Sequence, residues 1–177
     1  MTNHSYFNLA GEGRGDVLNQ KLCIYAHAYN PVCDSHSIPT GENASVEGTP
    51  MDFLKMKEIG QDIDADFEQL QFTGGYDHNF VTDNYAPGNV RRIAEAYCEE
   101  TGIAMSVSTD CPGVQFYAGN FIENEAGKNG HTYGKRDGFC LETQAEPNAV
   151  NEEAFHSPIL ETGEIYHSVT AYRFYIK

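Results

Sequence analysis

Four polar side chains stand among aromatic and aliphatic residues in four separate stretches of the chain. They are His4 in NHSYFNLAG, Asp77 in GGYDHNFV, Gln115 in PGVQFYAGN and Glu142 in GFCLETQ. Three of the four can titrate, and titratable side chains are the groups with which proteins move protons in acid–base chemistry. Four such insertions into apolar stretches are not expected by chance, so together they indicate a functional site.

Taken one at a time, these residues also have structural interpretations. His4, next to Asn3 and close to Tyr6, is typical of a histidine satisfied by a hydrogen-bond network. Asp77 follows two glycines and could form a turn, and Glu142 could be a charge that protects a sheet edge from aggregation. Composition alone leaves both interpretations open for each residue.

The elements that must position these side chains are mainly strands. Apolar residues recur with a period of two in 21–30, 102–110 and 166–176. Turn signals such as IPTGE, TGGYD, CPG and ETGE separate the strands at even spacing, which favours an all-β antiparallel sandwich. The one segment with a helical pattern is 52–70, and because Gly60 interrupts it we expect only one or two short turns there.

A calcium-like stretch lies within that segment. Asp62, Asp64 and Asp66 occupy alternate positions, as in a calcium-binding loop. The sixth position is Phe67 where the loop needs glycine, and the twelfth is Thr73 where it needs glutamate. We therefore interpret the stretch as an acidic turn that caps a short helix, without calcium.

The charge balance narrows the classes of partner. The 177 residues contain 11 lysines and arginines against 26 aspartates and glutamates, a formal net charge of −15. Such a charge repels nucleic-acid phosphates and anionic membranes, so we expect no nucleic acid and no membrane partner. The binding of a neutral ligand such as a sugar does not depend on this net charge.

The cysteines indicate a reducing compartment. They are odd in number and never form a CxxC pair, so neither a disulfide framework nor a zinc site is predicted. We also find no signal-like N-terminus and no apolar run of the roughly 18 residues that a membrane span needs. The sequence therefore predicts a soluble, cytoplasmic protein with free thiols at Cys23, Cys33, Cys98, Cys111 and Cys140.

A set of motifs in fixed order resembles the aldose 1-epimerase (galactose mutarotase) family. The resemblance runs from residue 2 to residue 175 and implies an antiparallel β-supersandwich whose concave face holds a sugar. It further implies interconversion of the α and β anomers of an aldohexose such as galactose or glucose, with no metal and no organic cofactor. The motifs that carry it are NHSYFNLAG, IPTGENASVEGTPMDF, IGQDIDADFEQL, GGYDHNFV, PGVQFYAGNF, YGKRDGFCLETQ and ILETGEIYHSVTAYRF.

The resemblance also implies a role for each of the four polar residues. His4 falls on the family's catalytic histidine and Glu142 on its catalytic glutamate, whereas Asp77 and Gln115 fall on positions that hold the sugar hydroxyls. The residue types fit the chemistry, because mutarotation needs a base for the proton of the C1 hydroxyl and an acid for the ring oxygen. We expect Glu142 to be the base and His4 the acid.

The chain departs from the family in length. Family members are longer and begin with strands that carry an arginine and a further sugar-contacting histidine, so we interpret residues 1–177 as one domain corresponding to the C-terminal portion. An alternative is a truncated, non-catalytic relative that binds sugar. Uncovered strand edges, above all around TNHSYFNL, favour a homodimer. We expect His78 to support the site or its strand, and the remaining histidines to be structural or on the surface: His27, His36, His131, His156 and His167.

Overall fold

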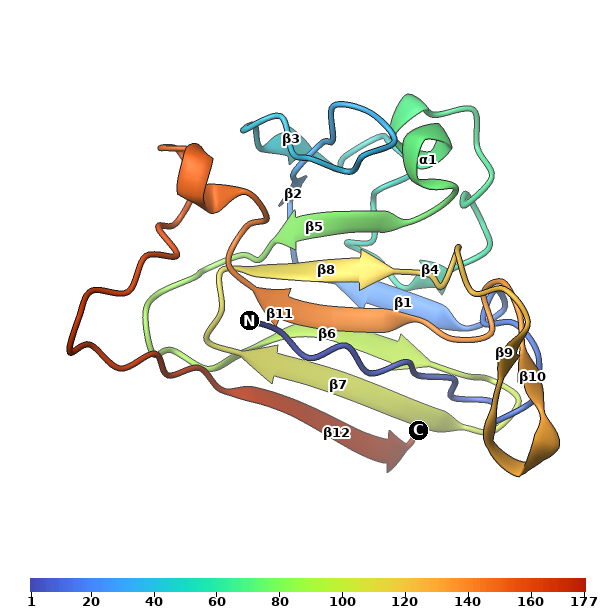
Figure 1. Cartoon of the computed structure of the whole chain (residues 1–177). Coiled ribbons are helices and arrows are strands. Elements are labelled where there is room, and N and C mark those ends of the chain that lie inside the picture. The colour runs from blue at the N-terminus through green and yellow to red at the C-terminus, as the bar shows by residue number, and fades with distance from the viewer.

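Two five-stranded antiparallel sheets form the body of the molecule (Figure 1). The computed structural model describes residues 1–177. The first sheet has the order β12-β7-β6-β1-β4, with β12 at one edge and β4 at the other. Its strands are β1 (Lys21–Ile24), β4 (Lys57–Glu58), β6 (Arg91–Tyr97), β7 (Ile103–Thr109) and β12 (Thr170–Ile176).

The second sheet has the order β11-β8-β5-β2-β3. A separate two-stranded hairpin, β9 with β10, lies at one end of the sandwich (Figure 1). One helical turn, α1 (Glu68–Thr73), precedes β5, and 3₁₀ turns occupy Lys128–Gly130 and Ala149–Asn151. The strands are β2 (Ala28–Tyr29), β3 (Ala44–Ser45), β5 (Asp77–Val81), β8 (Gly113–Tyr117), β11 (Cys140–Gln144), β9 (Glu125–Ala126) and β10 (Thr132–Tyr133).

The core lies between the two sheets as one continuous hydrophobic cluster. Alternation along the second sheet turns Phe80, Phe116 and Leu141 toward this core. Phe116 packs on Tyr76 with ring centroids 5.2 Å apart. Because the pleat sends every other side chain to the opposite face, the neighbours of these core residues point away from the cluster, and those neighbours form the candidate site.

Two of the three expected strands correspond to real strands, and one expectation is wrong. Segment 102–110 forms β7, and 166–176 contains β12, which begins only at Thr170. Segment 21–30 is not one strand: β1 ends at Ile24, and β2, in the other sheet, begins at Ala28. The Ala26 amide donates to the Ile24 carbonyl over 3.0 Å, a tight bend that carries the chain from one sheet to the other.

The expectation of only one or two short helical turns in 52–70 agrees with the structure, in which a single six-residue helix lies at the end of this segment. The helix begins at Glu68, and most of the earlier segment consists of turns plus the short strand β4. Side chains compete with helical hydrogen bonds there, since the Leu54 amide donates to the Asp52 carboxylate over 3.0 Å. The N-cap residue Phe67 has no side-chain capping bond, so the acidic turn does not cap the helix as expected.

No helix of the structure combines the length and the apolar character needed to cross a lipid bilayer.

Candidate active site

The outer face of β5, β8 and β11 gathers three of the four residues singled out in the sequence. Gln115 lies directly opposite Asn79 on one side and Glu142 on the other, and Asp77 is two residues from Asn79 on β5. Directly opposed residues and residues two apart share one face of a sheet. The strand register therefore places Asp77, Gln115 and Glu142 on one surface.

A glycine turn sets the direction in which β5 leaves the helix. The residue after α1, its C-cap Gly74, lies in the left-handed region (φ 65°), and Gly75 follows with φ 135°. The Asn120 amide donates to the carbonyls of Thr73 and Tyr76 over 3.3 and 3.0 Å. A side chain at Gly75 would collide with this amide, so the GG pair allows the sharp entry into the strand that carries Asp77.

His4 reaches the same surface from the N-terminal segment, which runs beside β11 at the edge of the second sheet (Figure 1). This segment is not the strand that the sequence suggested: its one pairing is a bridge in which the amides and carbonyls of Phe7 and Phe139 exchange bonds of 2.8 and 2.9 Å. Buried Gln20 anchors it further, since its amide donates to Asn8 over 2.7 Å. Tertiary contacts, and not local strand propensity, therefore hold His4 in place.

His4 and Glu142 form an ion pair. The His4 Nε2 atom lies 3.4 Å from the Glu142 Oε1 atom. The histidine side chain is 54% exposed and the glutamate side chain only 10%. Burial raises the pKa of Glu142, His4 opposes this rise and the nearby Asp77 adds to it. The pair thus combines a half-exposed imidazole with a carboxylate whose proton affinity is increased, a combination suited to acid–base chemistry.

Asp77 and Gln115 contact each other beside this pair. The Gln115 amide donates to the Asp77 carboxylate over 2.8 Å, and Gln144 donates to the Gln115 carbonyl over 3.4 Å. Burial raises the pKa of Asp77, while the bond from Gln115 and the charge of His4 act in the opposite direction. The four expected residues therefore form one cluster with both donors and acceptors for hydroxyl groups.

Sequence reasoning missed three neighbours of the cluster. Cys140, two residues before Glu142, has its sulfur 3.6 Å from His4 Nδ1. The rings of Tyr6 and Tyr117 lie 5.1 and 6.3 Å from the His4 ring. The signal was present in the sequence: Cys140 and Tyr117 are each two positions from a residue already singled out, so alternation puts them on the same face.

A group of three potential metal ligands lies within the cluster. One ligand atom from each of His4, Cys140 and Glu142 falls within 4.8 Å of the others. Imidazole, thiolate and carboxylate are the donor types that bind zinc in proteins.

His78 points to the other side of the sheet from its neighbour Asp77. It is buried, and its ring meets the Tyr29 ring edge to face at 5.9 Å. Burial lowers the pKa of His78 to about 4. This histidine is therefore a neutral residue of the core and supports its strand.

Acid should destabilise the fold through His78. Its imidazole binds a proton at pH 6.5 when exposed but only at about pH 4 when folded. Between these values the unfolded state binds more protons than the folded state. Each pH unit of acidification from 6.5 to 4 therefore lowers the contribution of His78 to the free energy of unfolding by about 1.4 kcal/mol. We expect His78→Phe to lose that part of the acid sensitivity in urea titrations between pH 6.5 and 4, whereas a variant of exposed His36, His36→Gln, keeps it. Equal pH slopes for wild type and His78→Phe would contradict this prediction.

The other histidines lie outside the cluster. Four of them pair with carboxylates, and His167 is exposed. The pairs are His27–Asp83, His36–Asp34, His131–Glu12 and His156–Glu146.

The three aspartates of the calcium-like stretch have separate partners. Asp62 accepts from Lys57 over 2.7 Å, and Asp66 accepts from Gln71 over 2.6 Å. Asp64 accepts two bonds, of 2.8 and 3.1 Å, from the Arg136 guanidinium. The carboxylates are thus used to hold neighbouring segments together.

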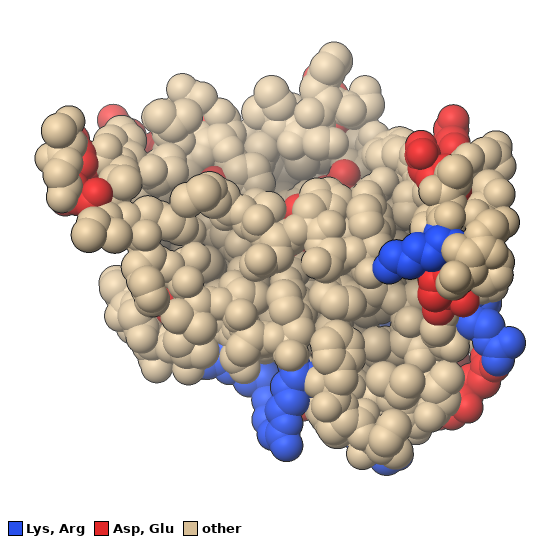
Figure 2. Space-filling model, turned by 60° about the horizontal axis from the view of Figure 1, so that its bottom comes forward, with Lys and Arg blue, Asp and Glu red and all other residues tan.

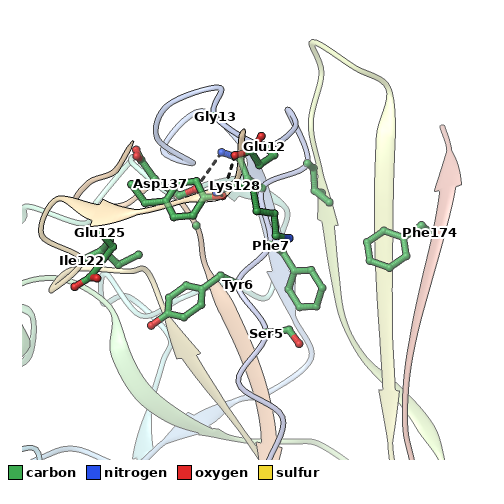
Figure 3. A pocket seen from close by; sticks show the side chains of 14 residues that line it. Ser5, Tyr6, Phe7, Glu12, Gly13, Ile122, Glu125, Lys128, Asp137 and Phe174 are labelled. Carbon is green, nitrogen blue, oxygen red and sulfur yellow. Dashed lines mark hydrogen bonds between the residues drawn. The ribbon is translucent and has the colours of Figure 1, made fainter. Parts of the chain in front are cut away.

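A pocket of about 670 Å³ borders the cluster at Tyr6 (Figure 3). It lies between the N-terminal segment and the β9–β10 hairpin, and Glu12, Lys128 and Phe174 contribute to its walls. None of the four residues singled out in the sequence lines this pocket. Burial is the main cause that raises the pKa of Tyr6 to about 12, so its hydroxyl can donate a hydrogen bond at neutral pH.

The surface has few positive charges. In Figure 2, acidic atoms are visible within the hollowed part of the face, whereas lysines and arginines lie toward its lower and right-hand edges. On this face the distribution agrees with the formal net charge of −15.

Comparisons with known proteins identify the family of this chain. The family model for aldose 1-epimerase matches residues 1–173. The chain is 42% identical over 175 residues to a galactose mutarotase of Bos taurus and 37% identical over 177 residues to an aldose 1-epimerase of Escherichia coli K12. Each alignment covers 98% of this chain. The chain belongs to the aldose 1-epimerase family, as the sequence motifs indicated.

Solved structures agree with this assignment. A GalM/aldose epimerase homologue from C. elegans superposes with a TM-score of 0.81 at 26% identity, over 99% of this chain and 50% of that one. A galactose 1-epimerase from Lactobacillus acidophilus gives a TM-score of 0.73 at 26% identity, over 99% and 48% of the two chains. The expected all-β sandwich of the mutarotase type is confirmed. The chain spans about half the length of the relatives that it matches.

Proposed function

We propose that this chain is an aldose 1-epimerase that interconverts the α and β anomers of an aldohexose such as galactose or glucose. The observation that carries the proposal is the His4–Glu142 pair. It brings an imidazole and a carboxylate that are distant in the sequence to within 3.4 Å of each other, beside the bonded pair of Asp77 and Gln115. Two relatives named galactose mutarotase and aldose 1-epimerase support the same chemistry.

The reaction needs two proton transfers in each direction. Glu142 takes the proton from the C1 hydroxyl while His4 gives one to the ring oxygen, and the hemiacetal opens to the aldehyde. Rotation about the C1–C2 bond exposes the other face of the aldehyde, and the ring closes with the two roles reversed. Each positioned proton transfer contributes roughly 10²–10⁴-fold to the rate.

The sugar must enter between the two groups. A hydrogen bond on each side of the hemiacetal needs about 2.7–3.0 Å, which leaves no room for a sugar while the groups are 3.4 Å apart. His4 is half exposed on an irregular segment, whereas Glu142 is nearly buried within β11. We therefore propose that the His4 side chain moves aside to admit the ring.

Polarimetry tests the proposal directly. Freshly dissolved α-galactose or α-glucose should reach its equilibrium rotation faster in the presence of the chain than in buffer alone. If the chain binds sugar but leaves the rate unchanged, the alternative is correct, namely a truncated, non-catalytic sugar-binding relative.

The five free cysteines support a reducing cytoplasmic location for the protein.

Sugar binding should depend more on Asp77 than on Gln115. A hydrogen bond to a charged partner contributes about 1.5–3 kcal/mol and a neutral one about 0.5–1.5 kcal/mol, so Asp77→Ala should weaken galactose binding more than Gln115→Ala. Because the two side chains share a 2.8 Å bond, the double variant should cost less than the sum of the single ones. Calorimetric titration measures all three. Equal affinities for wild type and Asp77→Ala would place the sugar elsewhere.

We propose that two copies of the chain associate along β12. This strand is outermost in its sheet, and Phe174 and Ile176 on it are 53% and 75% exposed. The segment TNHSYFNL, which the sequence favoured as the interface, forms only the Phe7–Phe139 bridge and offers no strand edge.

Light scattering should therefore give twice the chain mass of 19.6 kDa at micromolar concentration. Ile176→Lys should yield the monomer, because it places a charge in the apolar contact, and Val90→Lys, at an exposed site between β5 and β6, should not. A wild-type mass near 19.6 kDa would rule the dimer out.

A further inference from the structure

Three donors of different chemistry converge on the outer face of β11. They are the imidazole of His4, the thiol of Cys140 and the carboxylate of Glu142, with one ligand atom from each within 4.8 Å of the others. Cys140 and Glu142 are two residues apart on one strand, so their side chains leave the same face. His4 approaches from the N-terminal segment.

The distances suit a tetrahedral ion. Zinc holds nitrogen, oxygen and sulfur ligands at about 2.0–2.3 Å, so ligand atoms at neighbouring corners lie roughly 3.3–3.8 Å apart. His4 Nε2 is 3.4 Å from Glu142 Oε1, and His4 Nδ1 is 3.6 Å from the Cys140 sulfur. Glu142 faces the Nε2 atom of the His4 ring, and Cys140 faces the Nδ1 atom. To bind an ion that Glu142 and Cys140 also bind, the half-exposed imidazole must therefore rotate so that one nitrogen points at the ion.

The electrostatic surroundings also favour a cation. Asp77 and Glu142 bring two largely buried carboxylates to this face, and neither forms an ion pair with a lysine or arginine. His4 is the one basic side chain that pairs with Glu142. A divalent ion would compensate charge that the protein leaves largely uncompensated.

We propose that His4, Cys140 and Glu142 form a binding site for Zn²⁺ and that the bound ion blocks the candidate active site. The thiol and imidazole select zinc over Mg²⁺ and Ca²⁺, which prefer oxygen ligands. Binding replaces the S–H bond of Cys140 by a sulfur–zinc bond and the N–H bond at the ligating nitrogen of a protonated His4 by a nitrogen–zinc bond, and both protons go to the buffer.

The blocking effect rests on the proposed function, whereas the binding does not. Zinc would occupy the electron pairs with which Glu142 and His4 exchange protons with the sugar, so both proton-transfer groups would be lost at once. The ion is therefore an inhibitor and not a cofactor of this site.

Cobalt(II) is the probe for binding, because a thiolate ligand gives it a sulfur-to-metal charge-transfer band in the near ultraviolet. The experiment uses the Cys33→Ser chain as reference, since exposed Cys33 lies next to Asp34 and close to His36 and could bind metal by itself. We expect the band to appear in this reference, Zn²⁺ to remove it by displacing cobalt, and Mg²⁺ to leave it unchanged.

Variants of the ligands identify the site. In the Cys33→Ser background, Cys140→Ser should abolish the band, whereas Cys111→Ser, at another buried cysteine, should keep it. His4→Ala should weaken cobalt binding at least about tenfold. If Cys140→Ser fails to show a cooperative thermal transition, His4→Ala alone tests the assignment of the site. His4 is exposed and lies outside the strands, so its replacement should leave the fold intact.

Three results would overturn the proposal. One is the absence of a band in the reference, and another is a band that survives both Cys140→Ser and His4→Ala. The third is zinc binding that does not slow mutarotation, which removes the blocking role. If the zinc-free chain does not accelerate mutarotation, the proposed function is wrong instead. The cobalt titration measures metal binding alone, so its result does not depend on mutarotase activity.

Discussion

Replacing Glu142 with glutamine is expected to slow mutarotation by roughly 10²–10⁴-fold, the contribution of a general base. The amide keeps the shape of the side chain but cannot accept the proton of the C1 hydroxyl. Because burial already raises the pKa of Glu142, its carboxylate is a stronger base than an exposed one, and the loss should lie well inside this range. Polarimetry on fresh α-galactose measures the rate.

The control for Glu142→Gln is Glu95→Gln. Glu95 is also a partly buried carboxylate on a strand, with a side chain 17% exposed, but it lies on β6 of the other sheet and pairs with Arg92. We expect this variant to keep the wild-type rate, and both variants to keep a cooperative thermal transition. If Glu142→Gln retains more than about a tenth of the rate, Glu142 is not the base.

Replacing His4 with asparagine should slow mutarotation by roughly 10²-fold or more and change the shape of the pH profile. The active form needs Glu142 ionised and His4 protonated, so the wild-type rate should rise and then fall with pH. Burial raises the pKa of Glu142 above its usual value of 4.5 and shifts the acid limb to higher pH. The basic limb should vanish in His4→Asn, because the asparagine side chain has no group that ionises in this range.

His27→Asn is a matched control for His4. His27 is 63% exposed and pairs with the Asp83 carboxylate over 2.8 Å, so it is a surface histidine–carboxylate pair outside the candidate site. It should leave the bell-shaped profile unchanged. A wild-type profile that is flat from acid to alkaline pH would argue against the His4–Glu142 pair altogether.

Alternation within short stretches carried much of the information about the site. The period of two in PGVQFYAGN and GFCLETQ places Gln115 and Glu142 on the face opposite Phe116 and Leu141, and the structure shows that arrangement. The prediction of β7 succeeded for the same reason. Alternation is a local property, set by the pleat of the strand that contains it, so it can be read without knowledge of the fold.

Local pattern failed where distant contacts decide. Segment 21–30 alternates throughout, yet a bend after Ile24 divides it between two sheets, because each half pairs with a different, distant strand. The helical pattern of 52–70 did not outweigh side-chain bonds such as that from Leu54 to Asp52. Short elements gain too little free energy of their own to resist such contacts.

The candidate site also has a part that the local sequence predicts and a part that only the tertiary structure decides. Its residue types, and the family to which they point, are present in the sequence motifs. That His4 meets Glu142 and Cys140 was decided only by tertiary structure: the N-terminal segment has no strand of its own there and is held by the Phe7–Phe139 bridge and by buried Gln20. A contact between residues so far apart in the chain depends on the closed sandwich, since only the packed sheets overcome the entropy of closing so long a loop.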